Sequence, residues 1–162
     1  MKKLKIYLDT SVINFYFAED SPEKMKVTRE FFDDILINGK YEVFISLLVL
    51  EELGNTQEIE HRDRLIKFTN GLNVEVLLAN KEINRVAKQF TDEGYIPDKY
   101  KEDAFHLAFA LFYNIDYIVS WNFKHIVRPR TKDAVRIIAV KEGIKEVKIL
   151  TPEEVVADES EI

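Results

Sequence analysis

Short apolar runs alternate with longer amphipathic stretches along the whole chain. Runs of strand length, rich in strand-forming residues, lie at 4–8, 41–45, 74–78, 115–119 and 147–150. Segments with apolar residues at helical spacing lie between them, at 22–36, 47–53, 56–68, 80–90, 99–113 and 132–142. Strands that alternate with helices predict a parallel sheet sandwiched between helices, hence an α/β fold with four to five strands.

Residues that start and stop helices support this division. Ser21-Pro22 is typical of a helix start, Asn38-Gly39 of a helix end, and Ser46 is placed to cap the helix that follows the second strand. The segment from Ala104 to Phe112 is apolar almost all round. A helix with that pattern is buried on several faces, which places it in the centre of the molecule.

Length and composition describe one compact domain. The chain has 162 residues, 46% of them hydrophobic and 32% charged, which predicts a single domain over 1–155 and a frayed acidic tail over 156–162. The absence of cysteine excludes disulfides, thiolate nucleophiles and cysteine zinc sites and fits a cytoplasmic protein. No signal peptide or membrane-spanning run is expected. A net charge of −6 argues against avid, unspecific nucleic-acid binding.

Carboxylates and hydroxyls follow the strands at the points where ligands bind in such sheets. The carboxyl ends of parallel strands meet at one edge, so we expect Asp9, Ser46 and Ser120 to lie close together with Asn122. The helix after the second strand brings Glu51 and Glu52 to that edge. Asp103 joins from the start of the buried helix, where a carboxylate must be paired, hydrogen-bonded or bound to a cation.

Each of these residues also has a purely structural interpretation. Asp9 is well placed to cap the helix that begins at Thr10, and Asp103 is a first-turn acid favoured by the helix dipole. His106 shares a helix face with Asp103, yet a lone histidine is more often a satisfied structural group. For His125 a solvated position is equally plausible, and His61, which lies among charged residues, is expected at the surface.

Oxygen ligands decide which metal such a cluster suits. Carboxylates without cysteine or a histidine pair favour Mg²⁺, with Mn²⁺ as an alternative, over Zn²⁺. These ions support phosphoryl chemistry, because they activate a water molecule and neutralise charge on phosphate oxygens.

Four strings of sequence resemble a known family in order along nearly the whole chain. They are YLDTSVINFYF, ISLLVLEEL, EDAFHLAFALFYNIDYIVSWNFKHI and ILTPEEV. Together they are similar to the PIN-domain family, in particular the VapC-like toxins of prokaryotic toxin-antitoxin pairs. The resemblance implies a PIN-like three-layer fold with a central parallel sheet, and a metal-dependent ribonuclease centre built from three or four acids.

The resemblance also implies which residues form that centre. Asp9 matches the first family acid and Asp103 the third. Glu52, which directly precedes a leucine, matches the second, with Glu51 as the neighbouring alternative. The fourth position, normally an Asp, falls on Asn122, which keeps a carbonyl oxygen but no charge, so binding of a second metal ion is open. Asp116 begins a strand, so we expect it at the opposite edge in a structural role.

The hypothesis that follows is a Mg²⁺-dependent endoribonuclease in which Asp9, Glu52 and Asp103 hold the ion and Asn122 completes the shell. Its expected RNA contacts are the residues next to this site: Thr10, Ser11, Ser120, Lys124, His125, Arg128 and Arg130. Two other functions stay open. A phosphatase with an aspartyl nucleophile is disfavoured, because Ser11 stands where its second acid is needed. A degenerate PIN domain that binds RNA or a protein without cleavage is kept open by Asn122. For a toxin, the resemblance implies an antitoxin partner and a homodimer.

Overall fold

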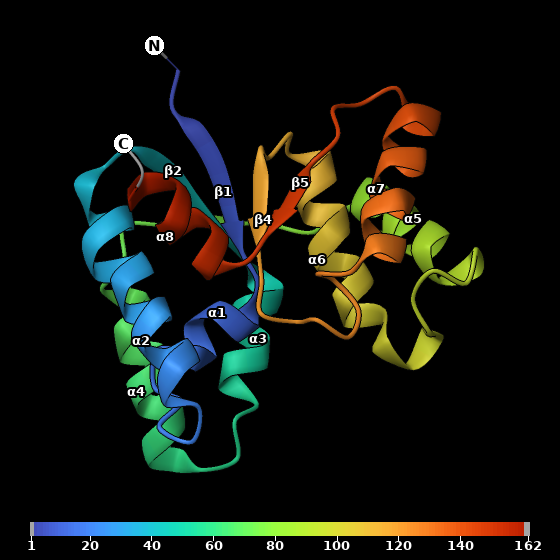
Figure 1. The fold of residues 1–162 in the computed structure, drawn as a ribbon. Coiled ribbons are helices and arrows are strands. Elements are labelled where there is room, and N and C mark those ends of the chain that lie inside the picture. Colours follow the sequence, from blue (N-terminus) through green and yellow to red (C-terminus); the bar gives the residue numbers. More distant parts are fainter. Residues whose placement is uncertain (1, 161–162) are drawn as a thin grey trace.

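The computed structural model describes residues 2–160 and contains a five-stranded, entirely parallel sheet with strand order β3-β2-β1-β4-β5 (Figure 1). Its strands are β1 (Leu4–Leu8), β2 (Tyr41–Ser46), β3 (Glu75–Leu77), β4 (Tyr117–Val119) and β5 (Lys148–Leu150). The central strand β1 is the most deeply buried, since Ile6, Tyr7 and Leu8 are wholly inaccessible. The predicted fold class and the number of strands are confirmed.

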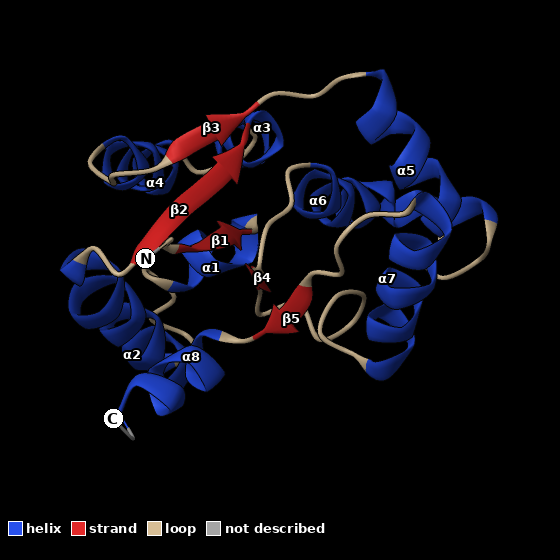
Figure 2. Cartoon of the chain, turned by 90° about the horizontal axis from the view of Figure 1, so that it is seen from above, coloured by secondary structure: helices blue, strands red, loops and turns tan. Residues whose placement is uncertain are grey.

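Helices cover both faces of the sheet, which gives the three layers expected from the sequence. They are α1 (Thr10–Phe15), α2 (Pro22–Glu30), α3 (Leu47–Gly54), α4 (Ile59–Asn70), α5 (Lys81–Asp92), α6 (Lys101–Phe112), α7 (Pro129–Glu142) and α8 (Pro152–Ser160). In Figure 2, α5, α6 and α7 lie together on one side of the sheet, and α1, α2 and α8 lie on the other. The predicted central helix is α6, whose residues Leu107 to Leu111 are buried.

Side chains cap several helices where the sequence suggests it. The Ser46 hydroxyl accepts a hydrogen bond from the Val49 backbone N–H, and the Asn80 side chain accepts one from Ile83. Thr151 and Glu154 form a reciprocal capping box at the start of α8. These caps fix where the chain turns from strand into helix at the carboxyl edge of the sheet.

Two helices differ locally from the expectation. Helix α4 begins at Ile59 after Glu58, not at a cap on Thr56. The helix begun at Pro22 widens into a π-helical turn over Phe31–Ile35 and then a 3₁₀ turn over Leu36–Asn38.

The acidic tail expected to fray from residue 156 instead continues α8 to Ser160. Glu159 accepts hydrogen bonds from Lys40 and Tyr41 there, contacts that no local pattern reveals. Residues 161–162 lie outside the described part. No helix within residues 2–160 is long and apolar enough to span a membrane.

Candidate active site

Asp9 lies at the carboxyl end of β1 and is almost completely buried. Its backbone occupies the N-cap position of α1, but its side chain makes no capping hydrogen bond. Instead the carboxylate accepts hydrogen bonds from the hydroxyls of Ser11 and Ser120. The interpretation of Asp9 as a side-chain helix cap is therefore excluded. Its carboxylate is instead held by two serines at the edge of the sheet.

Glu52 and not Glu51 joins the site from α3. Glu51 is exposed to solvent, whereas Oε1 of Glu52 accepts hydrogen bonds of 2.7 Å from the Thr10 hydroxyl and from Nε2 of His106. Thr10 follows Asp9 directly, so α1 and α3 are joined across the site. Glu51 is therefore not a member of this cluster.

His106 belongs to a buried hydrogen-bond chain that begins inside β1. The Tyr7 hydroxyl lies 2.7 Å from Nδ1 of His106 and 2.8 Å from the Ser46 hydroxyl. Both Tyr7 and His106 are buried. The chain thus runs from Ser46 through Tyr7 and His106 to Glu52 and fixes the orientation of the imidazole ring. We did not predict Tyr7 as a member of the site.

Asp103 and Asn122 are neighbours in the cluster. Burial raises the pKa of the Asp103 carboxyl to about 6, with contributions from the charges of Asp9 and Glu52, against the charge of His106 and a hydrogen bond from the Asn122 side chain. The Asn122 carbonyl oxygen is engaged elsewhere, since it accepts from the backbone N–H groups of Lys124 and His125. The Asn122 oxygen is thus occupied by backbone donors, while its side-chain amide is the group that lowers the pKa of Asp103.

Burial and neighbouring charges shift the pKa values of the groups in the cluster in different directions. Burial raises the pKa of Asp9 despite opposing contributions from His106 and the two serines. Burial alone would also raise the pKa of Glu52 and lower that of His106, but the hydrogen bond between them reverses both shifts. Glu52 and His106 thus behave as an ion pair, and Asp9 and Asp103 are carboxylates without a full countercharge.

These donors suit a hard divalent cation in chemistry but are not arranged around one point. Oxygen ligands from Asp9, Glu52 and Asp103 are those that Mg²⁺ and Mn²⁺ prefer, and a cation would favour the charged form of Asp103, whose pKa is raised mainly by burial and further by the charges of Asp9 and Glu52. Within residues 2–160, however, no three Asp, Glu or His side chains already form a group that could hold a metal ion. The oxygens of Asp9 and Glu52 instead face their hydroxyl and imidazole partners.

The basic residues expected to contact RNA have different environments. Arg128 donates to the Tyr95 carbonyl and Arg130 to the Gly94 carbonyl, so both tie the start of α7 to the loop that follows α5. Lys124 is exposed and lies beside the Tyr100 hydroxyl. His125 is buried, and neither ring nitrogen has a hydrogen-bond partner among the described residues.

Asp116 lies at the start of β4, at the other end of the sheet, as expected. Its carboxylate accepts hydrogen bonds from the Lys5 backbone N–H and from the Lys145 ammonium. These contacts join the N-terminal ends of neighbouring strands, which confirms a structural role.

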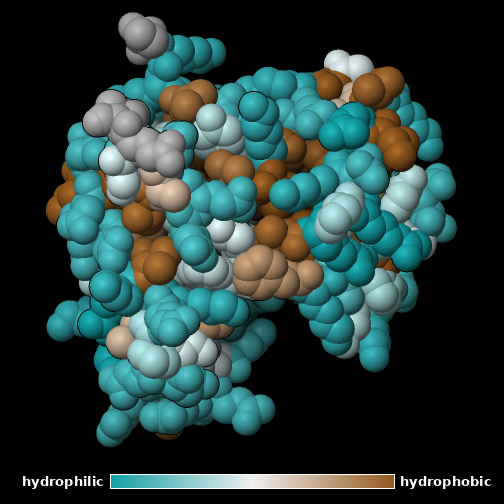
Figure 3. Space-filling view, viewed as in Figure 1, coloured by the Kyte–Doolittle hydropathy of each residue, from teal (hydrophilic) through white to brown (hydrophobic). Residues whose placement is uncertain are grey.

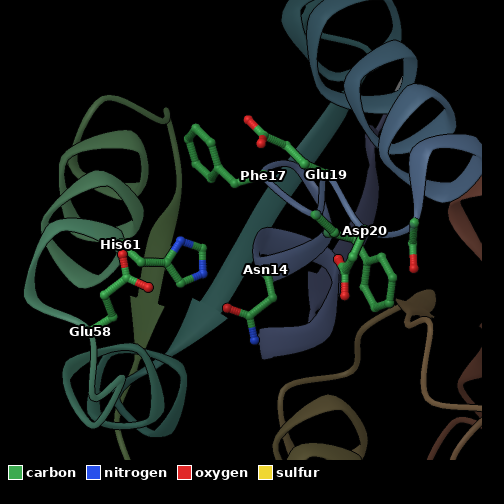
Figure 4. Close-up of a pocket in the computed structure, with 9 residues that line it drawn as sticks. Asn14, Phe17, Glu19, Asp20, Glu58 and His61 are labelled. Carbon is green, nitrogen blue, oxygen red and sulfur yellow. The ribbon is translucent and has the colours of Figure 1, made fainter.

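A cavity of about 420 Å³, lined by none of the carboxylates of the candidate site, lies between α1 and the start of α4. Figure 4 shows Glu58 and His61 on one wall, with Asn14 of α1 across from them. Glu19 and Asp20 line the cavity as well. With three carboxylates and His61, this cavity is unfavourable for a phosphate group.

Comparisons with known proteins agree with this fold. The family model described as PIN domain matches residues 6–125, and none of the curated proteins matches the chain. VapBC2 from Rickettsia felis, solved with a DNA fragment from its promoter, is 13% identical, with a TM-score of 0.57 over 91% of this chain and 98% of its own. VapBC-1 from nontypeable Haemophilus influenzae is 18% identical, with a TM-score of 0.59 over 92% and 98%. The sarcin-ricin loop cleaving toxin VapC20 from Mycobacterium tuberculosis is 13% identical, with a TM-score of 0.58 over 74% and 92%.

Proposed function

The chain belongs to the PIN domain family, and on this basis we propose that it is a Mg²⁺-dependent endoribonuclease. It hydrolyses RNA phosphodiester bonds, with Mn²⁺ as an alternative ion. In the cell it acts as the toxin of a toxin-antitoxin pair.

One observation carries the proposal. Asp9 after β1, Glu52 on α3 and Asp103 on α6 lie at the carboxyl edge of the sheet, and the pKa of Asp103 is raised to about 6 by burial and by the charges of Asp9 and Glu52. Carboxylates held together in this way are unfavourable unless a cation or a proton compensates them. Perturbed carboxyl groups of this kind are typical of functional sites.

The residues of the chain have distinct roles in this proposal. Asp9, Glu52 and Asp103 hold the ion, which when bound activates water and neutralises charge on the phosphate. His106 orients Glu52, and Ser11 and Ser120 orient Asp9. Asn122 donates to Asp103 and holds the loop that follows it.

A protein partner is part of the proposal. Two of the similar structures are VapBC complexes, and by analogy we propose that a cognate antitoxin binds this chain and covers its active site. We further propose a homodimer located in the cytoplasm. Co-expression with the product of a small neighbouring gene, followed by size-exclusion chromatography, tests the antitoxin and the homodimer.

Cleavage of RNA by the purified protein tests the enzymatic part. We expect cleavage in Mg²⁺, its loss in EDTA, and a loss of at least about 100-fold in Asp9→Asn and Asp103→Asn. Asp116→Asn is the matched control, because it removes a carboxylate from the opposite end of the sheet. Cleavage that persists in EDTA or in the Asp9 and Asp103 variants contradicts the proposal.

A second candidate is a PIN domain that binds RNA or a protein without cleaving RNA. It is favoured by the neutral side chain at position 122 and by the hydrogen bonds that already engage Asp9 and Glu52. Calorimetry separates the two functions. Binding of Mn²⁺ that is lost in Asp103→Asn supports the enzyme, and its absence in the wild-type protein supports the degenerate domain.

A further inference from the structure

A second cavity, of about 330 Å³, lies at the amino edge of the sheet, where the parallel strands begin. It is bordered by the start of β1, the turn between α6 and β4, and the connection from α7 to β5. In Figure 1 this edge is at the top, and α1, which follows Asp9, lies well below it. The charged and polar residues that line the cavity are Lys2, Lys3, Lys5, Asn114, Asp116 and Lys145.

Hydrogen bonds of the sheet hold the segments around this cavity in place. The Lys5 backbone N–H donates to the Asp116 carboxylate at 2.8 Å, and the Asp116 N–H donates to the Lys5 carbonyl at 3.0 Å. The Lys148 N–H donates to the Asp116 carbonyl, also at 3.0 Å. Asp116 thus joins the starts of β1, β4 and β5. The backbone around the cavity is fixed by the sheet, whereas the long lysine side chains can adjust to a ligand.

Positive charge is in excess at this cavity. Among the described residues that line it, four lysines face a single carboxylate, so the formal excess is three positive charges in a chain with a net charge of −6. Lys145 pairs with that carboxylate, its Nζ lying 2.5 Å from an oxygen of Asp116. Lys2 and Lys3 are exposed and have no ion-pair partner within residues 2–160. An anion would therefore compensate charge that the described part of the protein leaves uncompensated.

The chemistry of the lining indicates which anion fits. Lysine binds a phosphate as a point charge, without the fixed geometry that arginine requires. Figure 3 shows a largely hydrophilic surface beside the N-terminal end of the chain, and no aromatic ring is among the described residues that line the cavity. The cavity therefore offers charge to phosphate groups but no surface on which a nucleobase could stack.

The size of the charge excess favours several linked phosphates. A single phosphate group carries at most about two negative charges at pH 7, fewer than the excess at the cavity. Three linked phosphates supply enough charge within one compact molecule. The cavity volume also lies at the lower end of the range of about 300–1,000 Å³ that is typical of sites for small ligands.

We infer that this cavity binds a chain of linked phosphates, held by the ammonium groups of Lys2, Lys3 and Lys5. Lys145, next to Asp116, adds a fourth positive charge. The phosphates come either from an inorganic polyphosphate or from the tail of a nucleoside triphosphate, because both present the same chemistry to the lysines. The site lies at the opposite end of the sheet from the candidate active site, so the inference does not depend on the proposed nuclease activity.

Isothermal titration calorimetry with inorganic triphosphate, in EDTA and at low ionic strength, tests the inference. EDTA keeps Mg²⁺ from bridging phosphates to the carboxylates of the candidate active site. We expect saturation at one triphosphate per chain and an affinity that falls as salt screens the lysines. Comparison with ATP identifies the source of the phosphates. ATP that binds at least as tightly as triphosphate indicates a nucleotide tail, and ATP that binds more weakly indicates an inorganic chain.

A double charge reversal tests the two lysines that precede β1. Lys2→Glu/Lys3→Glu removes two contacts and adds repulsion without altering the sheet. An exposed ion pair typically contributes about 1.4- to 5-fold in affinity, so we expect a loss of at least about 5-fold for triphosphate. Lys26→Glu/Lys67→Glu is the matched control, because it changes the net charge equally at exposed positions of α2 and α4. Thermal melting confirms that both variants are folded.

Asp116→Asn is expected to change the affinity in the opposite direction. It removes the one carboxylate among the described lining residues and frees the Lys145 ammonium for the ligand. We expect triphosphate to bind about 1.4- to 5-fold more tightly. Asp63→Asn, an equal change of net charge at an exposed position of α4, is the control and should leave the affinity unchanged.

The outcomes separate a specific site from general attraction between charges. Equal losses in the two double lysine variants overturn the inference, as does AMP or a peptide of three aspartates that binds as tightly as triphosphate. Asp9→Asn should bind triphosphate like the wild type. A change of more than about twofold in that variant places the anion at the candidate active site and overturns the inference. No saturable binding by the wild-type protein at millimolar triphosphate overturns it as well, whether or not the protein cleaves RNA.

Discussion

Replacing Tyr7 by phenylalanine removes one oxygen atom from the interior of the candidate site. The Tyr7 hydroxyl is wholly buried and lies within hydrogen-bond distance of Ser46 and His106. Phenylalanine keeps the ring, including its stack on Phe109 at a centroid distance of 6.3 Å. The substitution therefore isolates the hydroxyl from the packing of the strand.

The expected loss of stability in Tyr7→Phe follows from the polar atom that loses its hydrogen-bond partner. The Ser46 hydroxyl keeps its hydrogen bond from Val49, but Nδ1 of His106, in a side chain that is 2% exposed, has no replacement. A buried polar group without a partner costs about 1–3 kcal/mol, and a net hydrogen bond contributes about 1 kcal/mol. We expect Tyr7→Phe to lower the free energy of unfolding by about 2–3 kcal/mol, or the melting temperature by roughly 5–10 °C in a chain of this size.

Urea unfolding in EDTA measures this change without interference from metal binding. Tyr117→Phe is the matched control, because Tyr117 lies beside β1 in β4 and its hydroxyl has no hydrogen-bond partner among the described residues. We expect less than about 0.5 kcal/mol for the control, as for most substitutions away from buried contacts. An equally small change in Tyr7→Phe refutes the inference that its hydroxyl orients His106, and with it the means by which Glu52 is held.

Three further predictions concern the acid cluster and the caps. Since the folded-state pKa of Asp103 is raised from 3.8 to about 6, its charge costs stability above about pH 6 and nothing below about pH 4. Asp103→Asn in EDTA is therefore expected to raise the free energy of unfolding at pH 8 by about 1–2 kcal/mol, after allowance for the partial exposure of Asp103. Equal free energies of unfolding for the wild type and the variant at pH 8, measured by urea titration, contradict this. Asn122→Ala frees two backbone N–H groups of the following loop and is expected to lower the free energy of unfolding by about 1 kcal/mol. Amide hydrogen exchange in that loop is expected to become faster, and unchanged exchange contradicts the role of Asn122 in holding the loop. Glu154→Ala breaks the capping box of α8 and is expected to cost about 1 kcal/mol by thermal melting, while Glu153→Ala, outside the box, is the control and should change little.

The parallel sheet and the place of Asp9 were predictable because both depend on local patterns. Leu4 to Leu8 is a short apolar run, and the geometry of parallel sheets places whatever follows such runs at one edge. The same rule correctly brought Glu52 and Ser120 towards Asp9 and placed Asp116 at the opposite end.

The roles of other residues depend on partners distant in sequence. Tyr7 reads as one more apolar residue of a buried strand, and only its contact with His106, 99 positions later, makes it part of the site. Arg128 lies in a basic run for which we expected RNA contacts, yet its partner is a carbonyl 33 residues earlier. No periodicity encodes such pairs, so the sequence indicates the edge at which the site lies but not which hydrogen bonds organise it.

The orientation of Asn122 bears on how many ions the site can hold. The Asn122 carbonyl oxygen already accepts two backbone hydrogen bonds and its amide faces Asp103, so it adds neither charge nor a free ligand oxygen. The cluster then has three negative charges, on Asp9, Glu52 and Asp103, and His106 supplies one positive charge when it pairs with Glu52. One divalent ion balances the remaining two, whereas a second ion would leave excess positive charge in a buried site with no carboxylate to bind it. We therefore expect a single divalent ion per chain, with Asn122 as a hydrogen-bond donor to Asp103 and not as a ligand.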